Sequence, residues 1–150
     1  MKLLEDKLDI DSITIMIQKE VADRLIATPG ERETGAITYS IYYYCIAQKI
    51  LEVPKDSFIP EPEVTSEVIN LKIRSKNIID VKNANKMFLI IKSAFMQRRK
   101  TLLNALTNTN IFENKEQGNK ILKELNLDTN IRPEKLTLQD YANIANKLVN

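Results

Sequence analysis

The sequence predicts an α/β region followed by an all-α region. Over the first half of the chain, short runs rich in β-branched residues alternate with helical patterns, whereas the second half has helical periodicity alone. The change falls near residues 75–82 and divides the 150 residues into two regions, 1–76 and 77–150. A chain of this length is expected to form one ordinary domain, or a partial domain with a small one.

Three strands are expected in the first region, at residues 12–17, 49–53 and 64–73. The first run, S-I-T-I-M-I, is apolar at most positions and predicts a strand buried on both faces. Two or three strands rarely make a complete sheet, so this region is expected to be the end of an α/β domain. An uncovered edge strand would allow the chain to associate with a second copy.

Helical patterns lie around these strands. Residues 1–9 have the partial apolar stripe of a helix end, and residues 18–27 predict a helix that stops at Pro29-Gly30. Residues 36–47 are helical in period, although their Ile, Thr and Tyr content is also compatible with a strand.

The second region predicts three helices. Residues 83–108 carry apolar side chains at three- and four-residue spacing without glycine or proline, which predicts one long amphipathic helix. Residues 116–125 predict a second helix, and Thr137 is placed to cap a third. The apolar face expected for the third helix consists of Tyr141, Ile144, Ala145 and Leu148.

Positive charge is concentrated in residues 76–110. This segment has seven Lys or Arg against Asp80 alone, whereas residues 1–75 have nine against thirteen acids. Such a one-sided excess is typical of a surface that binds a polyanion, and a solvated helix face is the equally open alternative. The cations expected to contact phosphates are Lys92, Arg98, Arg99 and Lys100, spread over the polar side of the long helix.

The composition excludes several kinds of site. The chain has no histidine and Cys45 is its single cysteine, which excludes a disulfide framework, a His-based metal site and a Ser-His-Asp triad. No glycine-rich phosphate loop occurs, and no metal site is expected. The charged N-terminus does not resemble a signal peptide, and no apolar run is long enough for a membrane span, so a cytoplasmic location is expected.

The segment of residues 53–71 holds the most distinctive aromatic residue. Phe58 is followed by Pro60 and Pro62, which forbid helix and favour an extended, stiff loop. An aromatic residue mounted on such a loop is either a packing residue or a platform on which a flat ligand stacks. Gln18-Lys19-Glu20, at the passage from strand to helix, is similarly either a ligand contact or an ion-pair cluster at a helix start.

Several segments together resemble a known family. They are M-I-Q-K-E-V-A-D-R-L-I-A-T-P-G (16–30), G-A-I-T-Y-S-I-Y-Y-Y-C (35–45), V-P-K-D-S-F-I-P-E-P-E-V-T-S-E-V-I-N-L (53–71), F-M-Q-R-R-K-T-L-L-N-A-L (95–106) and L-N-L-D-T-N-I-R-P-E-K-L-T-L-Q-D-Y-A-N-I-A (125–145). The sequence resembles the bacterial small-subunit rRNA adenine N6,N6-dimethyltransferases (KsgA type), which are related to the erythromycin-resistance methylases. The likeness extends over nearly the whole chain.

The resemblance implies an enzyme that transfers methyl groups from S-adenosylmethionine to two adjacent adenines near the 3′ end of 16S rRNA, with a role in ribosome biogenesis. It implies a Rossmann-like methyltransferase domain, of which residues 1–76 would be the C-terminal part, and a helical rRNA-binding domain at 77–150. The family's glycine-rich cofactor turn and its N-L-P-Y motif do not occur in this sequence. The resemblance therefore predicts a C-terminal half that binds no S-adenosylmethionine and is inactive alone.

By the same resemblance, Phe58 corresponds to the residue that stacks on the flipped-out target adenine, with Pro60 beside it. The sequence departs from the family pattern at Glu61, where a proline is common, and at Glu67, where alanine is common. The expected partner is small-subunit rRNA within an immature small ribosomal subunit. A non-catalytic RNA-binding or ribosome-assembly module and, more weakly, a helical protein-interaction domain are the alternatives.

Overall fold

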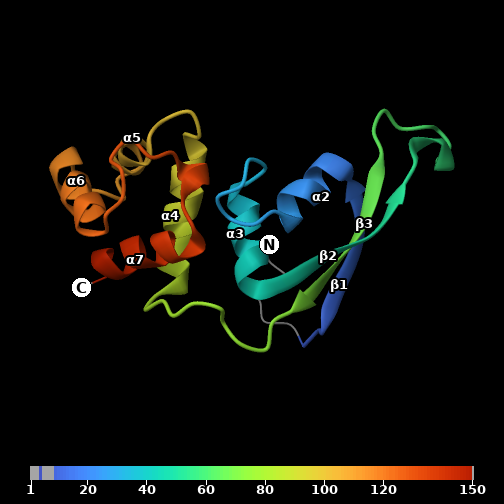
Figure 1. Cartoon of the computed structure of the whole chain (residues 1–150), viewed down its shortest axis with the longest axis horizontal. Helices are drawn as coiled ribbons and strands as arrows, with labels where there is room; N and C mark the ends of the chain where they lie inside the picture. Colours follow the sequence, from blue (N-terminus) through green and yellow to red (C-terminus); the bar gives the residue numbers. More distant parts are fainter. Residues whose placement is uncertain (1–3, 5–8, 150) are drawn as a thin grey trace. The chain divides into compact units, whose positions relative to one another are not determined.

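The structure is a computed structural model that describes Leu4 and residues 9–149. The helix end expected at residues 1–9 therefore lies mostly outside the described residues. The chain divides into two compact units (Figure 1). The first comprises Met1–Thr28 and Glu33–Asn77, and the second comprises Pro29–Arg32 and Ile78–Asn150.

The first unit is built on a three-stranded antiparallel sheet. The strands are β1 (Ser12–Gln18), β2 (Cys45–Val53) and β3 (Ser66–Ile73), in the order β1-β3-β2. The three predicted strands are confirmed, although β2 starts at Cys45 rather than at residue 49. β3 pairs with β2 from Ser66 to Ile73 and with β1 from Ser66 to Lys72, so β1 and β2 are the edges of this sheet.

The expectation that β1 is buried on both faces is wrong. Its residues alternate between half-buried and exposed, with Ile13, Ile15 and Ile17 packed against the core and Met16 52% exposed. The reason is that helices of this unit cover one face of the sheet (Figure 1). The opposite face carries Met16, Val68 and Leu51 in one row, because both Met16 and Leu51 pair with Val68.

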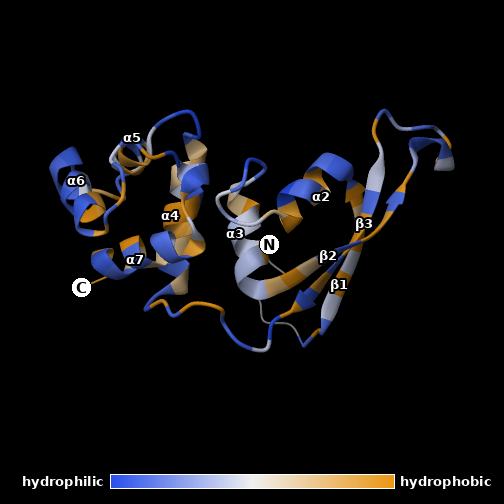
Figure 2. Cartoon of the chain, viewed as in Figure 1, coloured by the Kyte–Doolittle hydropathy of each residue, from blue (hydrophilic) through white to orange (hydrophobic). Residues whose placement is uncertain are grey.

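Two helices cover one face of the sheet. α2 (Lys19–Ile26) confirms the helix predicted after the first strand, and it buries Ala22 and Leu25. α3 (Ala36–Tyr44) ends three residues earlier than predicted, because the chain turns extended at Cys45 and enters β2. Figure 2 shows that the hydrophilic residues of α2 gather on its outer side. The buried core of this unit consists of Leu4, Ala22, Leu25, Ile41, Cys45, Ile69 and Leu71.

The second unit is helical. Its helices are α4 (Ala84–Met96), α5 (Leu102–Asn108), α6 (Lys115–Glu124) and α7 (Leu138–Leu148), and a short 3₁₀ turn, η2, covers Pro133–Lys135. The helix predicted at residues 116–125 is confirmed as α6. α7 is confirmed as well, with Thr137 as its N-cap in a capping box with Asp140. No helix in the described part of the chain is long and apolar enough to cross a bilayer.

The single long helix predicted at residues 83–108 is wrong, because the chain breaks into α4 and α5 at residues 97–101. Gln97 leaves the helical conformation with φ −125° and ψ 50°. Thr101 then caps α5 by accepting a hydrogen bond from the Asn104 amide, and the Leu102 amide donates to the Ile131 carbonyl at 2.8 Å. The five polar residues between the apolar faces of α4 and α5 have no apolar side chains with which a continuous helix could pack. The Thr101 cap and the hydrogen bond to Ile131 instead stabilise the start of a second helix, α5.

Candidate functional site

The loop of residues 54–65 joins β2 to β3 and carries Phe58. It opens with η1 (Lys55–Ser57), whose turn is closed by hydrogen bonds from the Ser57 amide to Pro54 and from the Phe58 amide to Lys55. Phe58 is half-buried and belongs neither to the buried core nor to the half-buried hydrophobic residues that pack against that core. Ile59 is fully exposed, Pro60 is exposed, and the peptide bond between them is cis. Phe58 is therefore a half-buried aromatic residue, outside the core cluster, in the loop between β2 and β3.

Glu61, one of the two departures from the family pattern, is paired within this loop. Its carboxylate lies 3.6 Å from the Lys55 ammonium, and both side chains are about half exposed. This ion pair connects Lys55, which precedes Phe58, with Glu61, which follows it. It also offsets part of the negative charge that Glu61 brings to the loop.

Glu67, the second departure, is brought next to Glu52 by a β-bulge. Lys49 pairs with Ile69, but the shift between Lys49 and Leu51 places Glu52 directly opposite Glu67 on the helix-covered face of the sheet. Without the bulge, strict alternation would place Glu52 on the other face. Two carboxylates directly opposite each other repel, so this arrangement requires cations.

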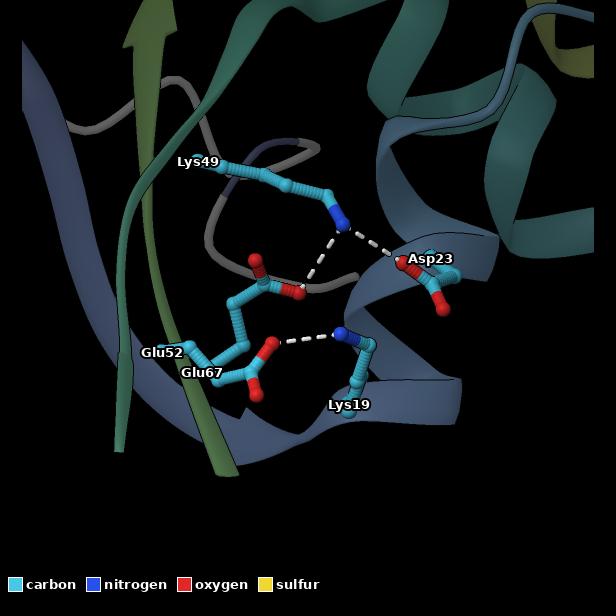
Figure 3. Close-up of polar contacts among 5 residues, drawn as sticks. All are labelled: Lys19, Asp23, Lys49, Glu52 and Glu67. Carbon is cyan, nitrogen blue, oxygen red and sulfur yellow. Dashed lines mark hydrogen bonds and ion pairs between the residues drawn. The ribbon is translucent and has the colours of Figure 1, made fainter. Parts of the chain in front are cut away.

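Two lysines supply these cations (Figure 3). The Lys49 ammonium lies 2.8 Å from Asp23 Oδ1 on α2 and 3.2 Å from Glu67 Oε2, and Glu67 is only 4% exposed. The Glu67 contact is an ion pair without good hydrogen-bond geometry. The Lys19 ammonium, at the start of α2, donates a hydrogen bond to Glu52.

These contacts stabilise the charged form of both lysines. The hydrogen bond to Glu52 raises the pKa of Lys19, and the hydrogen bond to Asp23, followed by the ion pair with Glu67, raises the pKa of Lys49. Of the three residues predicted at the strand–helix passage, Lys19 thus belongs to an ion-pair cluster, Glu20 pairs with Arg24 at 3.4 Å, and Gln18 is exposed.

The predicted phosphate-binding cations occupy two elements of the second unit. Lys92 is exposed on α4, whereas Arg98, Arg99 and Lys100 are exposed in the turn between α4 and α5. The expectation that all of them lie along one helix is wrong, because the helix breaks at Gln97.

The turn that carries the three cations is closed by several contacts. The Lys100 amide donates to the Gln97 carbonyl at 2.8 Å, and the Gln97 side chain accepts a hydrogen bond from Asn108 at the end of α5. Three consecutive cations are thus presented on a short connection between two helices.

The sequence reasoning missed Lys49 and the contact between Lys55 and Glu61. The Lys49 side chain meets these acids only because β3 and α2 bring Glu67 and Asp23 beside it, and the local sequence of β2 gives no signal for that. Lys55 and Glu61 could have been found, since opposite charges flank the proline-containing loop at a short separation. Among the described residues, no group of three His, Cys, Asp or Glu side chains is arranged to hold a metal ion.

Two curated relatives of this chain carry the same name. The chain is 43% identical over 148 residues to the ribosomal RNA small subunit methyltransferase A of Alkaliphilus oremlandii, covering 99% of this chain and 52% of the relative. It is 42% identical over 146 residues to the protein of the same name in Clostridioides difficile, covering 97% and 50%. The chain thus spans about half the length of the curated relatives that it matches.

Solved structures share the fold. A dimethyladenosine transferase from Plasmodium falciparum superposes with a TM-score of 0.74 at 21% identity, covering 95% of this chain and 58% of the other. The 23S rRNA methyltransferase ErmE superposes with a TM-score of 0.63 at 13% identity, covering 94% and 56%. The family model for ribosomal RNA adenine dimethylase matches residues 1–150. The chain therefore belongs to the ribosomal RNA adenine dimethylase family.

Proposed function

We propose that this chain provides the target-base and rRNA contacts of an rRNA adenine dimethyltransferase. The whole enzyme would transfer methyl groups from S-adenosylmethionine to the exocyclic nitrogens of two adjacent adenines near the 3′ end of small-subunit rRNA. The observation that carries the proposal is the half-buried Phe58, outside the core cluster, on a proline-containing loop in a chain whose family is established. In this proposal, β1, β2 and β3 form the end of a Rossmann-like methyltransferase sheet, and the second unit binds rRNA.

The described residues do not fit S-adenosylmethionine. A nucleotide-type cofactor needs a glycine-rich turn directly after a strand, where the backbone can approach it closely. Gly30 lies in the loop after α2, Gly35 precedes α3 and Gly118 lies inside α6, so none of the three glycines has that position. We therefore expect the 150 residues alone to transfer no methyl group, and we derive no chemical step through the cofactor.

Phe58 would act by stacking. An adenine must leave its helix before its exocyclic nitrogen can react, and a flipped-out base exposes both faces. An aromatic ring against one face contributes roughly 1–3 kcal/mol per base. Pro60 and Pro62 restrict the loop backbone, so less conformational freedom is lost when the base stacks.

The cationic turn would bind the rRNA backbone. Arginine and lysine neutralise phosphates and release condensed counterions, so affinity falls with salt. Arg99 and Lys100 are exposed side by side in the turn, and Lys92 is exposed on the preceding helix. Such contacts position the RNA without reading its sequence, which suits a protein in which Phe58 engages one particular base.

The test measures binding of the 150-residue chain to an RNA hairpin whose loop contains two adjacent adenines. Phe58→Ala is expected to weaken binding by about 5- to 150-fold, the equivalent of one lost stacking contact. Arg99→Ala with Lys100→Ala is expected to reduce the slope of log K against log salt by about 0.7 for each lost phosphate contact. Lys120→Ala, exposed on α6, is the control. Unchanged affinity in both sets of variants would refute the proposal.

A non-catalytic RNA-binding or ribosome-assembly module is the second candidate. It has the same Phe58 loop and cationic turn for binding RNA. The two candidates differ in whether a cofactor-binding region acts together with this chain. A glycine-rich turn and N-L-P-Y encoded upstream of Met1 would support the enzyme, and their absence from the gene and its neighbours would support the binding module.

A further inference from the structure

We infer that Lys19 is a positioning residue for the Phe58 loop, holding both ends of that loop through one residue at the junction of β1 and α2. The inference rests on the proposed function for its meaning, because it concerns how the stacking ring is presented. Whether Lys19 restrains the loop can be tested separately from whether Phe58 stacks on a base.

Lys19 contacts both ends of the loop. Its backbone amide donates a hydrogen bond of 3.0 Å to the carbonyl of Thr65, the last loop residue before β3. Its side-chain ammonium donates to Glu52, two residues before the loop begins at Pro54. The first residue of α2 thus contacts the chain where the loop leaves β2 and where it enters β3, beside the Val53–Ser66 pair that closes the loop.

The charges around Lys19 make this contact specific. The bulge in β2 places Glu52 opposite Glu67, so removal of either lysine leaves two adjacent carboxylates with less compensation. The Lys49 ammonium pairs with both Asp23 and the buried Glu67, whereas Glu52 has Lys19 as its partner (Figure 3). Lys19 and Lys49 therefore divide the acids between them, and Lys19 pairs with Glu52 of β2.

Within the loop, the contacts are local. The η1 turn and the Lys55–Glu61 pair at 3.6 Å join loop residues to one another, so they shape the loop without fixing its orientation on the sheet. Besides the prolines and the Val53–Ser66 strand pair, the contacts among the described residues that connect the loop ends to a different element are the two made by Lys19.

The chain offers a clean optical probe because it contains no tryptophan. Phe58→Trp introduces a single indole at the loop, and its fluorescence anisotropy reports local motion. In this background, Lys19→Met is compared with Lys19→Arg and with Lys147→Met. Lys147 is the matched control, because its ion pair with Glu124 in the second unit has a lysine exposure of 45%, equal to that of Lys19.

Lys19→Met is expected to lower the anisotropy of the indole, and to weaken binding of an oligoribonucleotide with two adjacent adenines by up to about fivefold, the range of one partly exposed ion pair. Lys19→Arg is expected to restore both, and Lys147→Met to leave both at the parent values. A purely structural role would instead lower the unfolding temperature while leaving the anisotropy of the folded chain unchanged.

Unchanged anisotropy in folded Lys19→Met, checked by circular dichroism, would overturn the inference. So would an equal drop in Lys147→Met. If the parent Phe58→Trp chain fails to bind the adenine oligonucleotide, the proposed stacking function fails, and the anisotropy comparison still decides the role of Lys19.

Discussion

Replacing Gly118 with alanine tests the packing between α5 and α6. Gly118 is buried in the interior of α6, where glycine normally costs about 1 kcal/mol relative to alanine. A Cβ added here would lie 2.6 Å from Leu103 Cδ1 and 2.6 Å from Phe112 Cδ2. Both distances are far below van der Waals contact, so the two neighbours must move.

The magnitude follows from which neighbour can move. Leu103 is half-buried and the end of its side chain can rotate, whereas Phe112 is fully buried and has no free space to enter. Overpacking of this kind typically costs 1–3 kcal/mol, and the gain in helix propensity offsets about 1 kcal/mol of it. We expect Gly118→Ala to lower the free energy of unfolding by about 1 kcal/mol.

The assay is urea denaturation followed by circular dichroism at 222 nm. Asn119→Ala, the neighbouring position of the same helix and only half-buried, is the control and should gain a few tenths of a kcal/mol from propensity alone. If Gly118→Ala proves as stabilising as Asn119→Ala, α5 and α6 are not packed as closely as the structure has them, and the reasoning is refuted.

Three further perturbations test local features. Tyr141→Phe removes the 2.9 Å hydrogen bond to the Pro133 carbonyl in the buried core and should cost about 1 kcal/mol in urea denaturation, with no change expected if that carbonyl finds another donor. Thr101→Ala removes the cap of α5 and should cost about 1 kcal/mol, accompanied by faster amide exchange at Asn104. Burial raises the pKa of the Cys45 thiol to about 11. Because the folded pKa lies above the unfolded value of about 8.5, the contribution of the thiol to the free energy of unfolding is constant below about pH 8.5. It is lost as pH rises toward 11. The parent should therefore lose about 2 kcal/mol more than Cys45→Ala between pH 8 and 10.5, and equal losses would contradict the shift.

Local patterns were enough to place most elements. The β-branched runs predicted all three strands, and Thr137 marked the start of α7, because an N-cap depends only on neighbours along the chain. The motif residues around Phe58 likewise identified the family before any geometry was known.

The order of strands and the side chains that meet across them were decided only by the tertiary structure. β1 reads as doubly buried, yet it is an edge strand with one face exposed, because periodicity does not reveal how many layers cover a sheet. The apolar pattern of residues 83–108 predicts one helix, yet the chain breaks before Leu102, whose amide donates to the carbonyl of Ile131, 29 residues away in sequence. The bulge that turns Glu52 toward Glu67, and so gives Lys19 its partner, depends on pairing between strands, and pairing is not encoded in either strand alone.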